Sequence, residues 1–137
     1  MTDVTVTTTN ESGFDTRSVI GDFEAGIDPM TESGPDPNSV LVADYAACFL
    51  PAVRMGARKS GYDDLGKMEI EAEAALTDTD NLESISFTLK VEADVEDPQE
   101  LIELGEQYCH VHTAVREELH ADVTIETDAF ETASTAA

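Results

Sequence analysis

The chain has 137 residues and carries 30 acidic against 7 basic residues, for a formal net charge of −23. Such a surface repels phosphate groups, so the composition excludes free nucleic acid and an anionic membrane surface as partners. The acidic residues alternate with apolar residues instead of forming one block, which favours a folded protein of a high-salt cytoplasm over a disordered acidic chain.

The N-terminal segment has no basic stretch followed by an apolar one, and the sequence has no uninterrupted apolar run of about 18 residues. We therefore expect neither a signal peptide nor a transmembrane span, and we expect a cytoplasmic protein. In such a reducing compartment, two cysteines are more often core residues or a redox pair than a permanent disulfide.

The first third of the chain predicts a small antiparallel sheet. Alternating and β-branched residues indicate strands at 4–9, 16–21 and 22–27. A loop rich in glycine and proline follows over residues 31–38.

An apolar helix is expected from about residue 39 to residue 60, capped by Asn38 or Ser39. Its only charged residue between positions 40 and 52 is Asp44. A helix that is apolar on nearly every side must be covered on nearly every side. A chain of this length offers few covering elements, so the pattern predicts an obligate homodimer with paired central helices.

The second half of the chain predicts two half-buried strands at 68–74 and 85–91, each with apolar and polar residues in alternation. A single helix is expected over residues 98–119, with Asp97 as its cap, because apolar residues recur along one face. A last strand is expected at 121–127.

Helices and strands occur in blocks along the chain, which predicts an α+β fold with antiparallel sheet. We expect one domain over residues 1–128 and a disordered tail of small polar residues over 129–137.

The two cysteines lie in different predicted helices, Cys48 in the first and Cys109 in the second. From the residues alone they are either buried core residues or a redox pair. Cys109 and His112 are one helical turn apart, but two ligands on one helix do not make a zinc site, so no metal is expected. Pro51 follows Cys48 by three residues and should kink the helix, which we interpret as a fit to the dimer partner.

Two stretches of the sequence resemble the OsmC/Ohr family: Gly34-Pro35-Asp36-Pro37 leading into Ala43-Asp44-Tyr45-Ala46-Ala47-Cys48-Phe49, and Glu106-Gln107-Tyr108-Cys109-His110-Val111. The resemblance covers nearly the whole chain and points to an acidic member of haloarchaeal type. It implies an OsmC-like fold, in which antiparallel sheets wrap around buried central helices in an intertwined dimer. It also implies a thiol-dependent peroxidase that reduces organic hydroperoxides, needs no bound cofactor, and is recycled by a dithiol reductant such as a lipoylated protein.

The resemblance assigns a role to three residues. Cys48 corresponds to the peroxidatic cysteine, which becomes a sulfenic acid, and Cys109 to the resolving cysteine that converts it to a disulfide. Arg17 corresponds to an arginine that offsets the preference of a buried cysteine for the neutral thiol. The alternative for Arg17 is a solvated turn residue paired with Asp15 or Asp22.

Two positions depart from the family pattern. Asn38 stands where a glutamate usually pairs with the arginine, and His110 stands where a proline often follows the second cysteine. Both departures indicate a divergent branch of the family. The alternative function is a non-catalytic OsmC-like module that binds a small apolar ligand at the dimer interface. The retained cysteine pair favours the peroxidase, whereas Asn38 favours the alternative.

Overall fold

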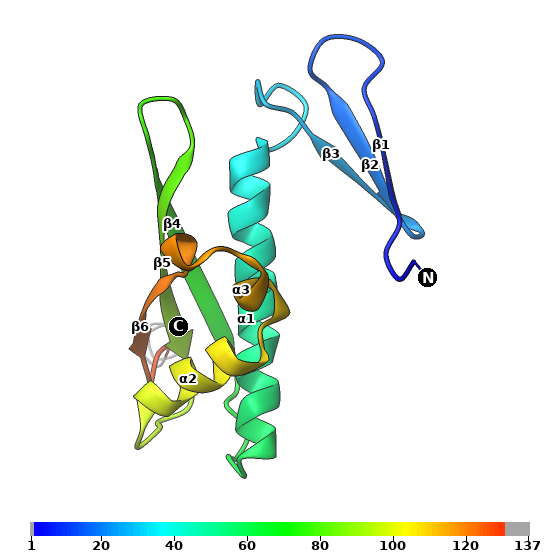
Figure 1. The fold of residues 1–137 in the computed structure, drawn as a ribbon. Helices are drawn as coiled ribbons and strands as arrows, with labels where there is room; N and C mark the ends of the chain where they lie inside the picture. Colours follow the sequence, from blue (N-terminus) through cyan, green and yellow to red (C-terminus); the bar gives the residue numbers. More distant parts are fainter. Residues whose placement is uncertain (1, 131–137) are drawn as a thin grey trace. The chain divides into compact units, whose positions relative to one another are not determined.

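A computed structural model describes residues 2–130 and shows an α+β chain, which confirms the predicted fold class (Figure 1). The chain divides into two compact units, one ending at Leu41 and the other beginning at Val42. The single domain predicted over residues 1–128 stays a prediction. Residues 131–137, the larger part of the predicted tail, lie outside the described residues, whereas Ala129 donates a backbone hydrogen bond to Val91 at 2.9 Å.

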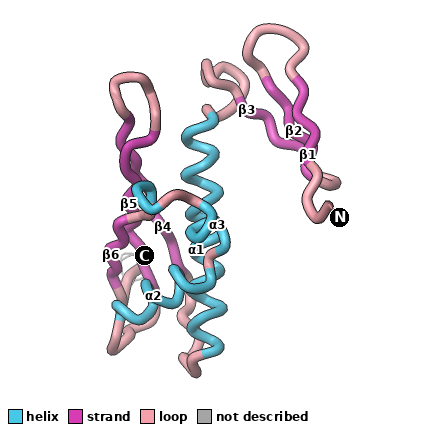
Figure 2. The backbone as a smooth tube through the Cα atoms, in the orientation of Figure 1, coloured by secondary structure: helices cyan, strands magenta, loops and turns pink. Residues whose placement is uncertain are grey.

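The first unit contains the predicted three-stranded antiparallel sheet, built from β1 (Val6–Thr9), β2 (Thr16–Ile20) and β3 (Phe23–Ile27) (Figure 2). The strands follow each other in space as they do in sequence. A two-residue turn joins β2 to β3, whereas a longer loop over residues 10–15 joins β1 to β2.

A buried carboxylate organises the loop that follows β3. Asp28 accepts hydrogen bonds from the backbone N–H groups of Met30, Glu32 and Ser33 and from the Ser33 hydroxyl. The hydrogen bond from Met30 leads the causes that lower the pKa of Asp28, so the side chain stays ionised. The loop therefore has a fixed course despite its lack of regular structure.

Helix α1 spans Pro37–Lys59 and so begins earlier than predicted. Its cap is Asp36 rather than Asn38 or Ser39, because Asp36 accepts from the backbone N–H groups of both residues. The helix continues through Pro51, whose side chain is exposed. Its length and hydropathy would suit a membrane span. Its buried residues, however, belong to the hydrophobic core of the second unit, as expected for a core helix.

The second unit contains a sheet with strand order β4, β5, β6. Strands β4 (Met68–Leu76) and β5 (Leu82–Val91) are antiparallel, as predicted. Strand β6 (Asp122–Glu126) pairs with β5 in parallel, so the expectation of a purely antiparallel sheet is wrong for this pair. The helical segment between β5 and β6 returns the chain to the end at which β5 began, which is the connection that parallel strands require.

The single helix predicted over residues 98–119 is also wrong. The structure divides it into α2 (Pro98–Tyr108), α3 (His110–Ala114) and a short 3₁₀ turn, η1 (Glu117–Leu119). The break falls on Cys109, which has an extended backbone with φ −84° and ψ 112°. The β-branched residues beyond this point have modest helix propensity, and the cysteine side chain caps the new helix start instead.

The core of the second unit forms where α1 and α2 meet the sheet. Tyr45, Phe49 and Phe87 pack edge to face, with Tyr45 and Phe49 ring centroids 4.8 and 5.6 Å from that of Phe87. Two glycines let the helices approach closely. A Cβ atom on Gly105 would lie 2.7 Å from the Phe49 ring, and one on Gly56 would lie 2.8 Å from the Cβ of Leu104.

We predict that Gly105→Ala destabilises the protein by about 1–3 kcal/mol, because the added methyl group overpacks a core made of rigid rings. This net loss already includes the gain of roughly 1 kcal/mol that alanine brings to a helix interior. Denaturant unfolding followed by circular dichroism at high salt measures the change. Gly26→Ala is the matched control, since its added Cβ would meet no atom closer than 3.8 Å. Equal stability of both variants would contradict the prediction.

Candidate functional site

The fold brings the two cysteines of the sequence together. Cys48 lies in α1 and is half-buried, whereas Cys109 lies at the break between α2 and α3 and is fully buried. The two side chains lie close enough to interact, since Cys48 is one of the groups that raise the pKa of Cys109, and both are free thiols. The fold thus brings one thiol from α1 near another from the break between α2 and α3, which makes the two cysteines candidates for a disulfide.

The surroundings of Cys109 keep its thiol protonated. The backbone N–H of Cys109 donates to the Gly105 carbonyl at 2.9 Å, and its sulfur accepts from the backbone N–H of His112 at 3.3 Å. Burial raises the pKa of Cys109 to about 11; the contact with Cys48 also raises it, and the hydrogen bond from His112 opposes the rise. The Cys109 thiol is therefore almost entirely protonated at neutral pH, and a protonated thiol is a poor nucleophile.

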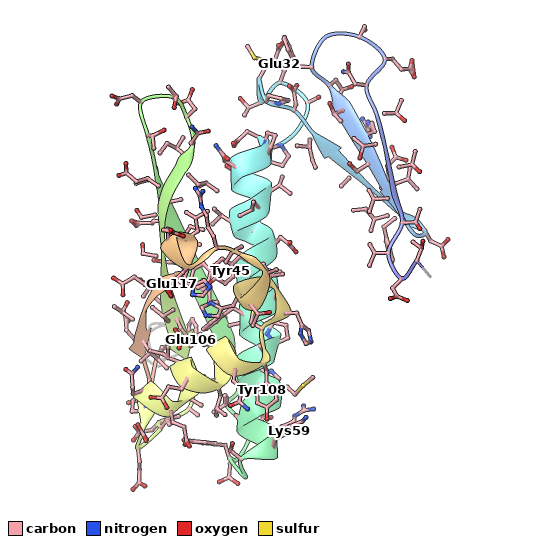
Figure 3. All side chains as sticks on the ribbon, in the orientation of Figure 1. Glu32, Tyr45, Lys59, Glu106, Tyr108 and Glu117 are labelled. Atoms are coloured by element: carbon pink, nitrogen blue, oxygen red, sulfur yellow. The ribbon has the colours of Figure 1, made fainter. Side chains whose placement is uncertain are left out.

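A buried tyrosine and histidine lie next to the cysteines. Figure 3 labels Tyr45, which lies on α1. Its hydroxyl is 2.5 Å from Nδ1 of His112 and accepts a hydrogen bond from the backbone N–H of Ala121 at 3.0 Å. Nδ1 of His112 is the acceptor that this site offers to the hydroxyl hydrogen, so we assign the hydroxyl as the donor and place the proton of the neutral imidazole on Nε2. Burial lowers the pKa of His112, and the stacked ring of His120, with centroids 4.0 Å apart, lowers it further.

The sequence analysis did not single out Tyr45 and His112 as a pair. Tyr45 precedes Cys48 by three residues, and His112 follows Cys109 by three. A spacing of three places side chains on one face of a helix. The equal spacing of Tyr45 and His112 from the two cysteines was therefore the sequence feature that could have indicated the pair.

Arg17 lies in β2 of the first unit and is exposed. Its guanidinium forms an ion pair with Glu24 of β3 at 3.2 Å, so its partner is neither Asp15 nor Asp22. Together with Asp15 and neighbouring residues, it lines a cavity of about 570 Å³. Asn38 belongs to the same unit and lies in the first turn of α1, where its backbone N–H donates to Asp36.

The histidines near Cys109 do not form a metal centre. His110 is exposed, whereas His112 is buried and bonded to Tyr45. Within residues 2–130, the structure places no three cysteine, histidine or carboxylate side chains so that they could hold a metal ion.

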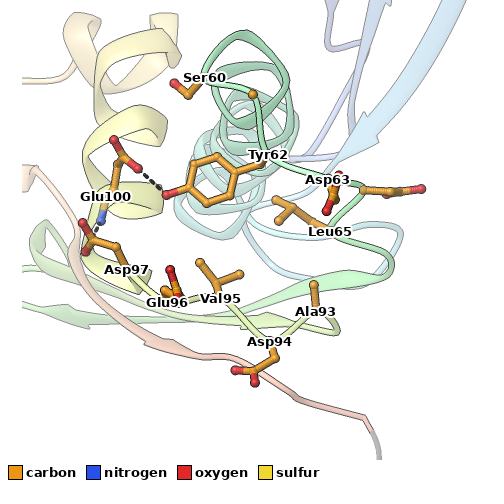
Figure 4. A pocket seen from close by; sticks show the side chains of 12 residues that line it. Ser60, Tyr62, Asp63, Leu65, Ala93, Asp94, Val95, Glu96, Asp97 and Glu100 are labelled. Carbon is orange, nitrogen blue, oxygen red and sulfur yellow. Dashed lines mark hydrogen bonds between the residues drawn. The ribbon is translucent and has the colours of Figure 1, made fainter.

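A separate pocket of about 520 Å³ lies in the second unit, lined by residues 60–65, 93–97 and 100 (Figure 4). The Tyr62 hydroxyl donates to the Glu100 carboxylate at its wall, and this hydrogen bond raises the pKa of Tyr62 to about 12. Neither cysteine lines this pocket. Its acidic wall is accounted for by the cap of α2, where Asp97 accepts from the Glu100 N–H, and by solvated carboxylates.

Comparison with known proteins identifies the class of protein that this fold and this cysteine pair define. The family profile described as OsmC-like protein matches residues 30–128, and the chain belongs to this family. This confirms the resemblance found in the sequence.

Among individual proteins, an uncharacterised protein of Haloferax volcanii is 53% identical over 132 residues, which cover 95% of this chain and all of that protein. This relative fits the interpretation that the acidic composition belongs to a protein of a high-salt cytoplasm.

Solved structures share the fold. The OsmC-like protein of Mycoplasma pneumoniae has a TM-score of 0.79 at 16% identity, covering 92% of this chain and 97% of its own. The organic hydroperoxide resistance protein of Bacillus subtilis has a TM-score of 0.62 at 24% identity, covering 92% and 98%.

We predict that Cys48 reacts with iodoacetamide well before Cys109 in the native protein. Cys109 is fully buried and, with a pKa of about 11, is almost entirely protonated at pH 8, whereas Cys48 is partly accessible. Peptide mapping by mass spectrometry after a time course measures both rates. In denaturant the two rates should become similar. In Cys48→Ser, the Cys109 rate should rise, because the neighbour that helps to raise its pKa is gone. Faster native alkylation of Cys109 than of Cys48 would contradict the assignment.

Proposed function

We propose that the protein is a thiol-dependent peroxidase that reduces organic hydroperoxides. In the first step the Cys48 thiolate attacks the distal oxygen of the hydroperoxide, and the O–O bond breaks. Cys48 becomes a sulfenic acid, the peroxide is reduced by two electrons, and the alcohol leaves after taking up a proton. The contact between Cys48 and Cys109 is the observation that carries this proposal.

In the second step Cys109 attacks the sulfur of the Cys48 sulfenic acid. A disulfide forms, and the hydroxyl leaves as water with the proton of the Cys109 thiol. An external dithiol then reduces the disulfide by two electrons and restores both thiols. A lipoylated protein is our candidate for this reductant. The order of the two cysteines follows from accessibility, since Cys48 is half-buried and Cys109 is fully buried.

Arg17 is proposed to stabilise the Cys48 thiolate and the peroxide oxygen. Its guanidinium stays charged in partly buried surroundings and offers several donors. Asn38 replaces the glutamate that usually holds this arginine in the family, but a carboxylate is still bonded to Arg17, namely that of Glu24. Exposed ion pairs constrain a side chain weakly, so we expect activity below that of members that carry the glutamate.

We further propose that the working form is a homodimer. Ala47, Pro51 and Met55 recur every four residues along α1 and are exposed, so they form one apolar stripe on a helix whose other side is core. In the first unit, Ile20 of β2 is paired with Val6 of β1 on one side and with Phe23 of β3 on the other. All three side chains are exposed. Sedimentation at high salt tests this proposal, and a folded monomer would overturn it.

The second candidate is a non-catalytic OsmC-like module that binds a small apolar ligand between the two copies. The substitution at Asn38 favours it. The two candidates differ in one observable, because only the peroxidase turns over peroxide.

We predict that one equivalent of cumene hydroperoxide converts the two thiols to a Cys48–Cys109 disulfide. Mass spectrometry should show the loss of two hydrogens and one linked peptide. Turnover with dihydrolipoamide should fall to background in Cys48→Ser. In Cys109→Ser the sulfenic acid at Cys48 should accumulate and be trapped by dimedone. If Cys48 remains a free thiol in excess organic peroxide, the proposal of a peroxidase is rejected, and the non-catalytic binding module remains as the candidate function.

We predict that Arg17→Met lowers the rate constant for peroxide reduction by at least about tenfold, because the thiolate loses a cationic partner of roughly 1.4 kcal/mol or more. The pH profile of Cys48 alkylation should move to higher pH. Arg58→Met, which removes an exposed arginine of α1, is the matched control and should change neither quantity. Asn38→Glu should raise turnover. An unchanged alkylation profile in Arg17→Met would assign thiolate stabilisation to another group.

A further inference from the structure

A buried hydrogen-bonded pair links the segment that carries Cys109 to the helix that carries Cys48. Tyr45 lies one turn before Cys48 on α1, and its hydroxyl bonds to His112 and Ala121. These two residues lie on either side of η1, so one hydroxyl fixes both ends of the segment that follows Cys109. His112 is in turn bonded to Cys109, since its backbone N–H donates to the sulfur at 3.3 Å.

We propose that the Tyr45 hydroxyl and the neutral imidazole of His112 form a positioning pair that holds Cys109 against Cys48, and that protonation of His112 releases Cys109. This inference rests on the proposed function, because the reaction that it controls is the formation of the Cys48–Cys109 disulfide. Neither side chain takes part in the chemistry. Both act through the position of the Cys109 sulfur.

The geometry requires a neutral histidine. The Tyr45 oxygen already accepts from the Ala121 N–H, so its hydrogen needs an acceptor, and Nδ1 of His112 supplies it. A proton on Nδ1 would leave the hydroxyl hydrogen without a partner in a buried site, which is costly. Tyr45 stays a donor throughout, because burial raises its pKa, with smaller contributions from Cys109 and Glu106.

The groups around His112 set the direction of the pH dependence. Tyr45 faces it from α1, Cys109 from the helix break, and His120 from the segment before β6. A charge on His120 disfavours a second charge on the stacked His112 ring. Because the pKa of His112 in the folded protein lies below its ordinary value of about 6.5, the positioning pair is intact at and above about pH 6.5. It is lost only as the pH falls further, through the lowered pKa.

Ellman's reagent isolates the step in question without any peroxide. The Cys48 thiolate displaces one thionitrobenzoate and forms a mixed disulfide. The Cys109 thiolate then attacks the Cys48 sulfur, and a second thionitrobenzoate leaves. The first release reports the reactivity of Cys48, and the second reports how well Cys109 is placed.

Tyr45→Phe removes the shared hydroxyl and should slow the second release about tenfold, with little effect on the first. His112→Asn keeps an acceptor near the position of Nδ1 but cannot be protonated, so its second release at neutral pH should match that of the wild type. The ratio of the wild-type rate to the His112→Asn rate should stay near 1 above about pH 7 and fall progressively below about pH 6.5. Taking this ratio cancels the dependence of thiolate concentration on pH.

His110→Asn is the matched control, since it makes the same change at the exposed neighbouring histidine and should leave the wild-type pH profile unchanged. A constant ratio of wild type to His112→Asn from about pH 8 down to the lowest pH at which circular dichroism shows folded protein would overturn the release by protonation. A wild-type second release in Tyr45→Phe would overturn the positioning pair. If the second release behaves as expected but the wild type does not reduce peroxide, the proposed function fails, whereas the positioning of Cys109 by Tyr45 and His112 is supported.

Discussion

The close crossing of α1 and α2 is the constraint on which the site depends. Gly105 lies so near Phe49 and Val53 that a methyl group in its place would overlap both side chains. The carbonyl of the same glycine accepts the backbone N–H of Cys109, so the point of closest approach is one turn from the buried sulfur. The nearness of the two cysteines is therefore a consequence of backbone packing at this glycine.

The sequence predicted the parts of this structure that are encoded by local pattern. Alternation identified the strands, because a half-buried strand must show one apolar face. The long apolar helix could likewise be recognised from its run of apolar residues, and the segment around its cysteine supported the family resemblance. The start of α1 was misplaced because aspartate, asparagine and serine all cap helices, and only the fold shows that Asp36 holds the N–H groups.

The remaining differences arise from features that a repeating apolar pattern does not reveal. The apolar stripe from Leu101 to Leu119 looks like one helix, but the sulfur of Cys109 caps a new start and divides it. The parallel pairing of β6 depends on how far the broken helices carry the chain back along β5. Tyr45 and His112 are 67 residues apart, so no local pattern joins them, although each lies three residues from a cysteine.

The use of a cysteine sulfur as a helix cap has a consequence for spectroscopy. The sulfur of a thiol accepts a hydrogen bond weakly, and the sulfur of a disulfide has no proton to lose and cannot become the stronger thiolate acceptor. The His112 amide is thus bonded to an atom whose acceptor strength changes with oxidation. The chemical shift and the solvent exchange rate of this one backbone amide make it a built-in reporter of the redox state, readable by NMR without any added label.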